Sequence, residues 1–169
     1  SVSVNDFRAG MRQMTAAVNV VTSVLRGERS GMTATAVMSV TAEPPLLAVA
    51  VNRTNTSYRI IKEAGIFAVN VLPLDHIVTA KLFGSAGRGD ERFLGGDWDT
   101  LITGAPTLLR DATCFDCRVE QTIDFSSHAM FVGLVEAIRV NKANAPLLYV
   151  DGTYASIAPD KDNILDAYE

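Results

Sequence analysis

Five polar side chains and an arginine stand in a row at positions 52 to 57. The run is Asn52-Arg53-Thr54-Asn55-Thr56-Ser57, and it precedes a segment of helical character at 58–64. The first turn of a helix offers unpaired N–H groups and the positive end of the helix dipole, which attract anions. With the charges of Arg53 and Arg59, the run predicts a phosphomonoester site. A simple helix cap needs only one such residue, so the run alone leaves both interpretations open.

The segment Thr33-Ala34-Thr35-Ala36 combines small side chains with strand character. Small residues on consecutive strand positions allow a flat ring to lie close to the backbone, whose peptide groups can then hydrogen-bond the edge of that ring. Tight packing inside a barrel requires small residues as well. Taken by itself, the segment favours packing over ring binding.

The two cysteines, Cys114 and Cys117, have the spacing found in many zinc and dithiol sites. They lie in a segment of strand character, where side chains three positions apart point to opposite faces. The chain has no other cysteine, and its only histidines are His76 and His128. We therefore expect no metal site and no dithiol chemistry.

Conventional catalytic and nucleotide-binding motifs are missing from the sequence. His128 begins a strand after a polar turn, a position where most histidines are partly exposed and carry no function. No Ser-His-Asp order and no pair of acidic residues predicts hydrolytic chemistry. The glycine-rich run 84–89 follows a predicted helix rather than a strand, so we expect a flexible loop and not a dinucleotide-binding turn. A Rossmann dehydrogenase is therefore not expected.

Composition narrows the class of protein further. The chain has 169 residues, of which 48% are hydrophobic, and a net charge of −4. The acidic balance argues against a broad nucleic-acid surface, and no apolar run approaches the ~18 residues of a membrane span. The excess of apolar residues predicts a large core and a subunit interface. The first residues lack the features of a signal peptide, so we expect a cytoplasmic protein.

The pattern of elements predicts a mainly β protein. Strands follow one another with few helices between them, which favours an antiparallel barrel with helices packed outside over a doubly wound sheet. We expect one domain over residues 1–159 and an acidic tail at 160–169. The predicted helices are 5–14, 58–64 and 73–84, a loop covers 85–98, and the predicted strands are 18–25, 32–40, 46–51, 66–72, 113–123, 129–140, 146–150 and 154–157.

Several short motifs, taken together, resemble one known family. They are Ala16–Thr22, Gly31–Val37, Ser39–Thr41, Pro44-Pro45, Ala68–Leu72, Phe83-Gly84, Glu91–Phe93, and His128 followed by Phe131–Gly133. In this order they resemble the short-chain flavin reductases, the reductase components of two-component flavin-dependent monooxygenases. The likeness is strongest to the reductase of 4-hydroxyphenylacetate 3-monooxygenase and extends from residue 7 to about residue 157.

The resemblance implies an FMN-binding split β-barrel, antiparallel and Greek-key-like, that works as a homodimer. It also implies a set of site residues. Thr33, Ala34, Thr35 and Ala36 would lie beside the flavin ring and ribityl chain, Ala50, Val51 and Asn52 would continue that wall, Thr56 and Ser57 would hold the phosphate, Phe83 and Gly84 would close over the flavin, His128 would lie near the nicotinamide nucleotide, and Tyr154 would line the same cleft.

Two departures from the family pattern affect these expectations. Relatives often have Gly-Asp before the histidine and Thr after it, whereas this chain has Ser126, Ser127 and Ala129. The phosphate segment lacks the lysine of some relatives, so threonine and serine hydroxyls with Arg53 or Arg59 would take its place.

The implied function is transfer of hydride from NADH or NADPH to FMN, or to FAD, with reduced flavin passed to a separate oxygenase. One alternative keeps a bound flavin and passes electrons to a corrinoid, to ferric iron or to a protein. Another is a flavin-binding protein without catalysis, and a weaker one is a pyridoxamine-phosphate-oxidase-like enzyme. The sequence does not separate NADH from NADPH, FMN from FAD, or a tightly bound flavin from an exchangeable one.

Overall fold

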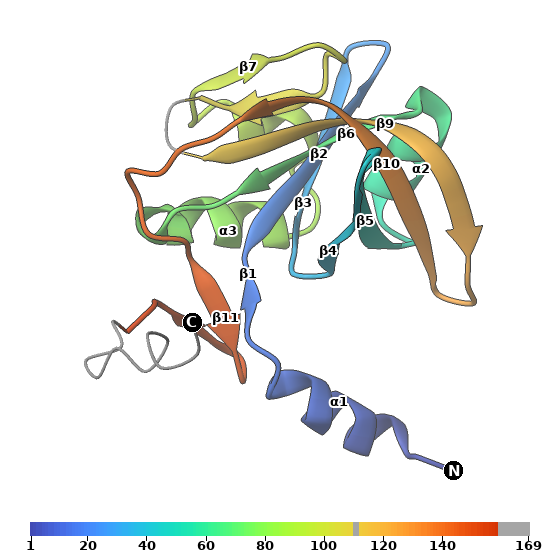
Figure 1. Cartoon of the computed structure of the whole chain (residues 1–169), viewed down its shortest axis with the longest axis vertical. Helices are drawn as coiled ribbons and strands as arrows, with labels where there is room; N and C mark the ends of the chain where they lie inside the picture. The colour runs from blue at the N-terminus through green and yellow to red at the C-terminus, as the bar shows by residue number, and fades with distance from the viewer. Residues whose placement is uncertain (110–111, 159–169) are drawn as a thin grey trace.

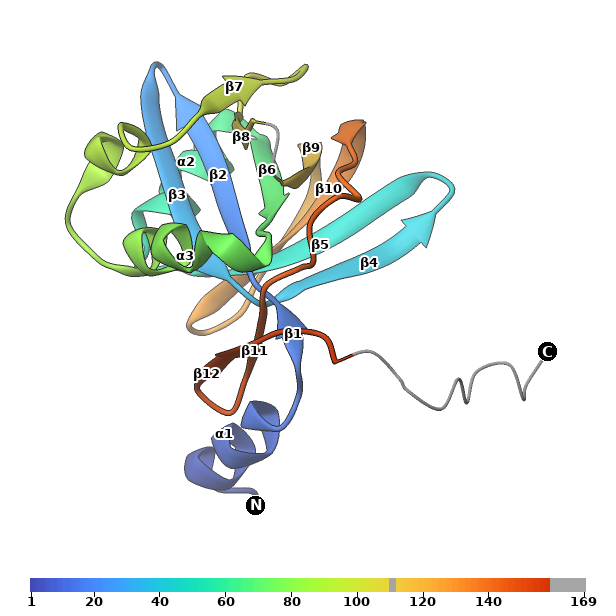
Figure 2. The ribbon, with the colours of Figure 1, turned by 90° about the vertical axis from the view of Figure 1, so that its left-hand side faces the viewer.

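A seven-stranded antiparallel sheet forms the body of the protein in a computed structural model that describes residues 1–109 and 112–158. The first and last strands of the sheet follow each other in the chain, separated only by Thr35 and Ala36. The sheet therefore curls into a barrel that stays open between them, and Figure 2 shows β4 and β5 diverging from β2 and β3. The order across the sheet is β3 (Glu28–Ala34), β2 (Asn19–Leu25), β6 (Ile66–Val71), β9 (Thr113–Asp124), β10 (His128–Arg139), β5 (Pro45–Asn52) and β4 (Val37–Ala42). The predicted mainly β, antiparallel split barrel is confirmed.

Two small sheets flank the barrel. The segments β1, β11 and β12 form a narrow sheet below it (Figure 1), where the Tyr149 and Tyr154 rings meet edge to face at 5.4 Å. The pair β7 and β8 lies at the opposite end of the barrel. The bounds are β1 (Ala16–Ala17), β11 (Leu148–Val150), β12 (Thr153–Ala155), β7 (Trp98–Thr100) and β8 (Pro106–Leu108).

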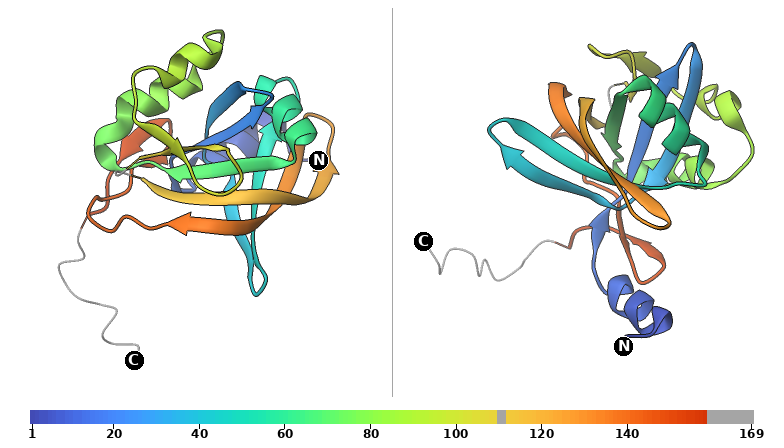
Figure 3. Two further views of the ribbon diagram at one scale, coloured as in Figure 1. Left: turned by 90° about the horizontal axis from the view of Figure 1, so that it is seen from above. Right: turned by 90° about the vertical axis from the view of Figure 1, so that its right-hand side faces the viewer.

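The helices lie outside the barrel (Figure 3). Helix α2 begins after Asn55, whose side chain accepts a hydrogen bond from the Ser57 N–H at 2.9 Å, and it ends at Gly65 in the left-handed conformation. Helix α1 projects away from the barrel and buries none of its residues. The bounds are α1 (Val4–Arg12), α2 (Thr56–Ala64), η1 (Leu74–His76), α3 (Ile77–Gly84) and η2 (Gly89–Phe93). None of the helices in residues 1–109 and 112–158 is long and apolar enough to cross a membrane.

Two clusters of apolar side chains stabilise the two faces of the central strands. One fills the barrel around Phe67 and Phe131, and the other lies under α3 around Phe83 and Phe93. Close packing explains Gly31, where an added Cβ would lie 2.6 Å from the Phe83 ring. The ring of Phe83 is thereby held against β3.

The structure corrects three expected element boundaries. The segment 32–40 is not one strand, because the chain bends at Thr35–Ala36 and the Val37 N–H bonds back to the Thr35 carbonyl. The strand expected to begin at residue 32 begins at Glu28, because the turn before it is only Arg26 and Gly27, both with positive φ, a conformation that suits a two-residue hairpin. The loop expected over 85–98 contains η2 and buries Phe93. The acidic tail at 160–169 lies outside the described residues.

Candidate functional site

Two hollows meet beside the C-terminal end of α3. The tyrosine hollow, of about 420 Å³, is lined by Val18, Thr33, Ala34, Thr35, Ala80, Lys81, Gly84, Ser85, Tyr149 and Tyr154. The polar hollow, of about 330 Å³, is lined by Asn52, Thr54, Asn55, Thr56, Phe83, Gly84, Ser85, Ala86, Gly87 and Arg92. Because Gly84 and Ser85 line both, the two hollows adjoin. Together they collect eight of the residues expected from the sequence: Thr33, Ala34, Thr35, Asn52, Thr56, Phe83, Gly84 and Tyr154.

The tyrosine hollow has a firm backbone wall and an aromatic side. The Thr33 hydroxyl donates a hydrogen bond of 2.6 Å to the Ala80 carbonyl, which ties β3 to α3. The Tyr149–Tyr154 pair closes the side formed by β11 and β12. Apolar faces with hydroxyl and peptide groups at the edges are what a flat heterocyclic ring requires.

The polar hollow lies at the N-terminus of α2. The Asn52 side-chain oxygen accepts hydrogen bonds from the Thr54 N–H and hydroxyl, both at 2.9 Å, and Asn55 caps the helix. Below the surface, Ser57 is 1% exposed and its hydroxyl has no hydrogen-bond partner among the described residues. A buried hydroxyl without a partner costs about 1–3 kcal/mol. The cap therefore uses Asn52 and Asn55, and the buried Ser57 hydroxyl stays without a partner in the described part of the chain.

The cation at this hollow is not the one expected from the sequence. Arg53 donates to the Phe125 carbonyl at 3.2 Å, and Arg59 pairs with Glu28 at 3.1 Å, so neither lines the hollow. Arg92, from η2, does line it. The sequence indicated a role for Arg92 only through its membership of the Glu91–Phe93 motif. Its place at the polar hollow could not be read from the sequence, because the fold is needed to bring η2 beside α2.

The environment of Arg92 leaves its charge available. Its guanidinium donates to the carbonyls of Phe83 and Ser85 at 3.4 Å and of Gly89 at 3.3 Å, and it lies 5.2 Å from the centre of the Phe83 ring. All its acceptors among residues 1–109 and 112–158 are neutral carbonyls. Burial lowers the pKa of Arg92, but an arginine stays charged at neutral pH. The guanidinium can therefore pair with an anion in the hollow.

Six expected residues lie outside the walls of the two hollows. His128 is exposed, faces Asn52 across the β5–β10 pair, and has its Nδ1 2.8 Å from the Ser127 hydroxyl. Through Asn52 it borders the polar hollow. The others are Ala36 at the bend, Ala50, whose N–H bonds to the Ala36 carbonyl, Val51 in the core, Arg53, and Ser57 below the surface.

Comparison with known proteins identifies the family. The model of the family described as "Flavin reductase like domain" matches residues 11–158. This chain is a flavin reductase family member. It is 37% identical over 149 residues to "FMN reductase (NADH) RutF" of Agrobacterium fabrum, a match that covers 88% of this chain and 86% of the relative.

Solved structures of this family superpose closely on the chain. One is "NADH:FAD oxidoreductase SgcE6" of Streptomyces globisporus, solved with NAD and FAD fragments, with a TM-score of 0.86 and 26% identity over 94% of each chain. Another is BorF, "the Flavin Reductase Component of a Bacterial Two-Component Tryptophan Halogenase", with a TM-score of 0.84 and 26% identity over 94% of this chain and all of BorF. The suspected family is thus confirmed.

The two cysteines of this flavin reductase family member are buried core residues. Cys114 packs in the cluster under α3 and Cys117 in the barrel cluster, so their side chains point to opposite faces as expected. Burial raises the pKa of Cys114 to about 11 and that of Cys117 to about 12. Both thiols therefore stay protonated at neutral pH, and they are poor nucleophiles.

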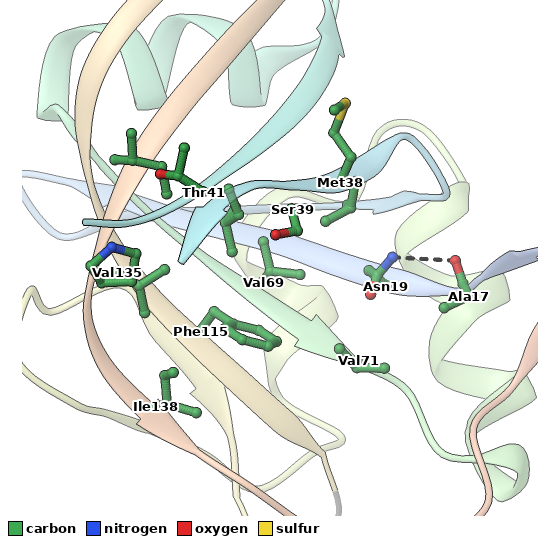
Figure 4. Close-up of a pocket in the computed structure, with 14 residues that line it drawn as sticks. Ala17, Asn19, Met38, Ser39, Thr41, Val69, Val71, Phe115, Val135 and Ile138 are labelled. Atoms are coloured by element: carbon green, nitrogen blue, oxygen red, sulfur yellow. Dashed lines mark hydrogen bonds between the residues drawn. The ribbon is translucent and has the colours of Figure 1, made fainter. Parts of the chain in front are cut away.

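An apolar groove marks the opening of the barrel (Figure 4). It has a volume of about 320 Å³, and Val69, Val71 and Phe115 project into it from the barrel strands while Met38 and Ser39 of β4 lie at its edge. The Asn19 amide at one end bonds to the Ala17 carbonyl at 3.2 Å. We call this surface, which Ile138 of β10 also lines, the split groove. It offers apolar side chains and no charged group.

Proposed function

We propose that this chain is an NADH-dependent FMN reductase, with the flavin phosphate in the polar hollow and the flavin ring toward the tyrosine hollow. The RutF relative of Agrobacterium fabrum carries this activity in its name. The observation that carries the proposal is the unpaired, buried Ser57 hydroxyl at the α2 N-terminus, next to a hollow whose arginine has no carboxylate partner among the described residues.

The residues present fit the phosphate end of FMN. A phosphate monoester brings about two negative charges and several acceptor oxygens at neutral pH. The Thr56 hydroxyl and the Arg92 guanidinium, which line the hollow, and the buried Ser57 hydroxyl beside it are all donors. No acidic side chain of the described residues lines the hollow to repel the phosphate.

The chain's contribution to the reaction is positioning. A bound flavin supplies the ring that accepts hydride from a reduced nicotinamide, and that chemistry belongs to the cofactors. Thr33, Gly84 and Tyr154 would hold the flavin ring and shield one side from water. No residue needs to act as a general base, which agrees with the absence of an acid–base pair among the residues that line the two hollows.

Anaerobic mixing tests the proposed activity. The purified protein with FMN and NADH is expected to bleach the visible flavin absorbance over many turnovers. The same measurement with NADPH in place of NADH, and with FAD in place of FMN, compares the rates of bleaching for the two nicotinamides and the two flavins. Binding of FMN without bleaching by either nicotinamide would instead identify a flavin-binding protein without reductase activity.

His128 is proposed to contact the nicotinamide nucleotide. It borders the polar hollow through Asn52 and its ring is exposed. We expect His128→Ala to raise the KM for NADH about fivefold, equivalent to about 1 kcal/mol, because one hydrogen bond or ring contact is lost. The dissociation constant for FMN, measured by fluorescence quenching, is expected to stay the same. An unchanged KM for NADH would remove His128 from the site.

The fate of the reduced flavin is the second part of the proposal. We propose that it diffuses to a separate oxygenase-type enzyme, by analogy with BorF, the reductase component of a two-component halogenase. The polar hollow is open to solvent at its exposed Thr54 and Thr56 side, which suits an exchangeable flavin. A yellow protein that retains stoichiometric FMN through purification would favour a fixed flavin serving a corrinoid, iron or protein acceptor.

We also propose that the chain forms a homodimer. Two apolar surfaces have no cover within residues 1–109 and 112–158: the split groove, and the stripe Val4, Phe7, Met11 and Met14 of α1 and its end. Exposed apolar surface of this extent marks an interaction site. A second copy of this chain carries the same two apolar surfaces, so two copies could cover each other's surfaces without a different protein.

A charge in the split groove is expected to weaken the dimer. Met38 is 59% exposed in the single chain, so Met38→Asp costs the monomer little, but it would bury a carboxylate in the interface. We expect the dimer dissociation constant, measured by analytical ultracentrifugation, to rise at least about tenfold. Ile102→Asp, at an exposed position away from the groove, is the control. Equal dissociation constants for both variants would place the interface elsewhere.

A further inference from the structure

An arginine of β3 attaches the short helix η2 to the barrel. The Arg29 guanidinium donates from Nε and Nη2 to the two carboxylate oxygens of Asp90, at 2.6 Å and 2.9 Å. The same guanidinium lies 4.6 Å from the centre of the Phe93 ring. Arg29 therefore contacts η2 near its start and at its end. Neither Arg29 nor Asp90 lines the polar hollow.

These two contacts fix the rotation of η2 about its own axis. A 3₁₀ helix has three residues per turn, so residues three positions apart lie on the same side. Asp90 and Phe93 have this spacing and both meet β3, where an added Cβ on Gly31 would lie 3.4 Å from the Phe93 ring. Arg92 projects from a different side of η2 and lines the polar hollow. Holding Asp90 and Phe93 against β3 therefore sets the direction of Arg92.

The chain that joins α3 to η2 does not fix this direction. Residues 85–88 connect the two helices, and Gly87 and Gly89 both have positive φ. Glycine is conformationally permissive, so this connection is compatible with several orientations of η2. The hydrogen bonds of Arg92 itself, at 3.3–3.4 Å, are longer than the usual ~2.9–3.0 Å. The contacts of η2 with β3 must therefore supply the constraint.

The charge of Asp90 gives this constraint a measurable signature. A carboxylate two positions before Arg92 repels a phosphate bound beside Arg92. The hydrogen bonds from Arg29 lower the pKa of Asp90, so its carboxylate stays ionised at neutral pH. By charge alone, neutralising Asp90 would strengthen phosphate binding. If Asp90 holds Arg92 in place, the same change weakens it.

We propose that Arg29 and Asp90 are positioning residues, which hold Arg92 in the direction that binds the flavin phosphate. The proposal rests on the function proposed above, in which Arg92 is the phosphate cation of the polar hollow. Exposed ion pairs contribute little to stability. A bidentate pair between an arginine and a carboxylate nevertheless fixes the relative orientation of its two partners, because the planar fork accepts the carboxylate in one geometry.

The variant Asp90→Asn tests the proposal, because it keeps the size of the side chain and removes its charge. We expect the dissociation constant for FMN to rise about fivefold, since η2 loses one of its two anchors on β3. Riboflavin has no phosphate, and its dissociation constant is expected to change by less than about twofold. Fluorescence quenching measures both constants.

Glu136→Gln is the matched control. Glu136 accepts from Arg118 Nε at 2.8 Å and Nη2 at 3.3 Å, so it also forms a bidentate pair, but between β9 and β10 and outside both hollows. We expect its FMN affinity to equal that of the unmodified protein. Asp90→Asn is also made in the Arg92→Met background. No further loss of FMN affinity is expected there, because the side chain that the pair positions is absent.

The unmodified protein and Arg92→Met are measured first. Failure of the unmodified protein to bind FMN, or equal FMN affinity in Arg92→Met, would overturn the proposed phosphate site and the positioning role with it. If Arg92→Met does weaken FMN binding, three results would overturn the positioning role alone. They are unchanged or tighter FMN binding in Asp90→Asn, equal losses for FMN and riboflavin, and the same loss in the Arg92→Met background as in the unmodified one.

Discussion

Replacing Arg92 by methionine is expected to raise the dissociation constant for FMN about thirtyfold. The change removes the guanidinium that lines the polar hollow and keeps an unbranched apolar stem of similar length. A charge-assisted hydrogen bond to a phosphate contributes about 2 kcal/mol, and thirtyfold is the corresponding ratio of affinities. Fluorescence quenching of FMN by the protein measures it directly.

Riboflavin separates this role from a structural one. Arg92 also bonds to the carbonyls of Phe83 and Ser85, so its loss could loosen the end of α3. Riboflavin has the ring and ribityl chain but no phosphate, and its affinity is expected to change by less than about twofold if Arg92 serves only the phosphate. Equal losses for FMN and riboflavin would show that Arg92 acts only by supporting α3.

Arg53 and Arg59 provide matched controls beside the same hollow. Arg59 already pairs with Glu28 and Arg53 with the Phe125 carbonyl. The variants Arg53→Met and Arg59→Met remove the same charge from the protein but not from the hollow, and we expect FMN affinity to stay within about twofold. A large loss of FMN affinity in Arg53→Met would show that Arg53, as expected from the sequence, binds the phosphate.

Local patterns in the sequence were sufficient for the parts of the fold that depend on neighbouring residues. The cap at Asn55 and the stop at Gly65 place α2, and runs of β-branched and other apolar residues place β2, β5 and β6. The bend at Thr35–Ala36 was not predicted, because the pairing of β4 with β5, rather than a turn residue, sets it. The family resemblance, and not the pattern of elements, supplied the split barrel.

The residues that line the tyrosine hollow were predictable from the sequence, whereas the charged residue of the polar hollow was not. Thr33–Thr35, Gly84 and Tyr154 meet in one hollow as the resemblance implied. Arg53 and Arg59, the arginines nearest the polar run in sequence, were the expected phosphate cations. The side chain of a helical residue, however, points in a direction that its position in the helix fixes. Arg59 therefore points to Glu28 on β3, whereas Arg92 comes from η2, three elements beyond β6 in the chain. Only tertiary structure brings that residue to the polar hollow.

Substituting Ser57 by alanine is expected to change stability and binding in opposite directions. The Ser57 hydroxyl is buried without a partner among the described residues, so its removal should raise the free energy of unfolding of the flavin-free protein by about 1 kcal/mol. The same change should weaken FMN binding about tenfold, because the phosphate loses a donor that the protein holds ready for it. Urea unfolding without flavin and FMN titration measure the two effects.

Ser30 makes the comparison decisive, because it is a second buried serine whose hydroxyl has no partner in the described part of the chain. Like Ser57 it lines neither hollow of the proposed flavin site, but it lies on β3, and its chain neighbours Arg29 and Gly31 do not line the polar hollow as Thr56 beside Ser57 does. Ser30→Ala is therefore expected to give a similar gain in stability, with FMN affinity unchanged. If both variants gain stability and neither loses affinity, the Ser57 hydroxyl does not bind the phosphate. If Ser57→Ala instead loses stability without flavin, the hydroxyl has a partner in the protein or in bound water. A gain in stability together with a loss of affinity, confined to Ser57, means that this polar atom is kept unpaired for a ligand, since active sites commonly retain destabilising groups that function requires.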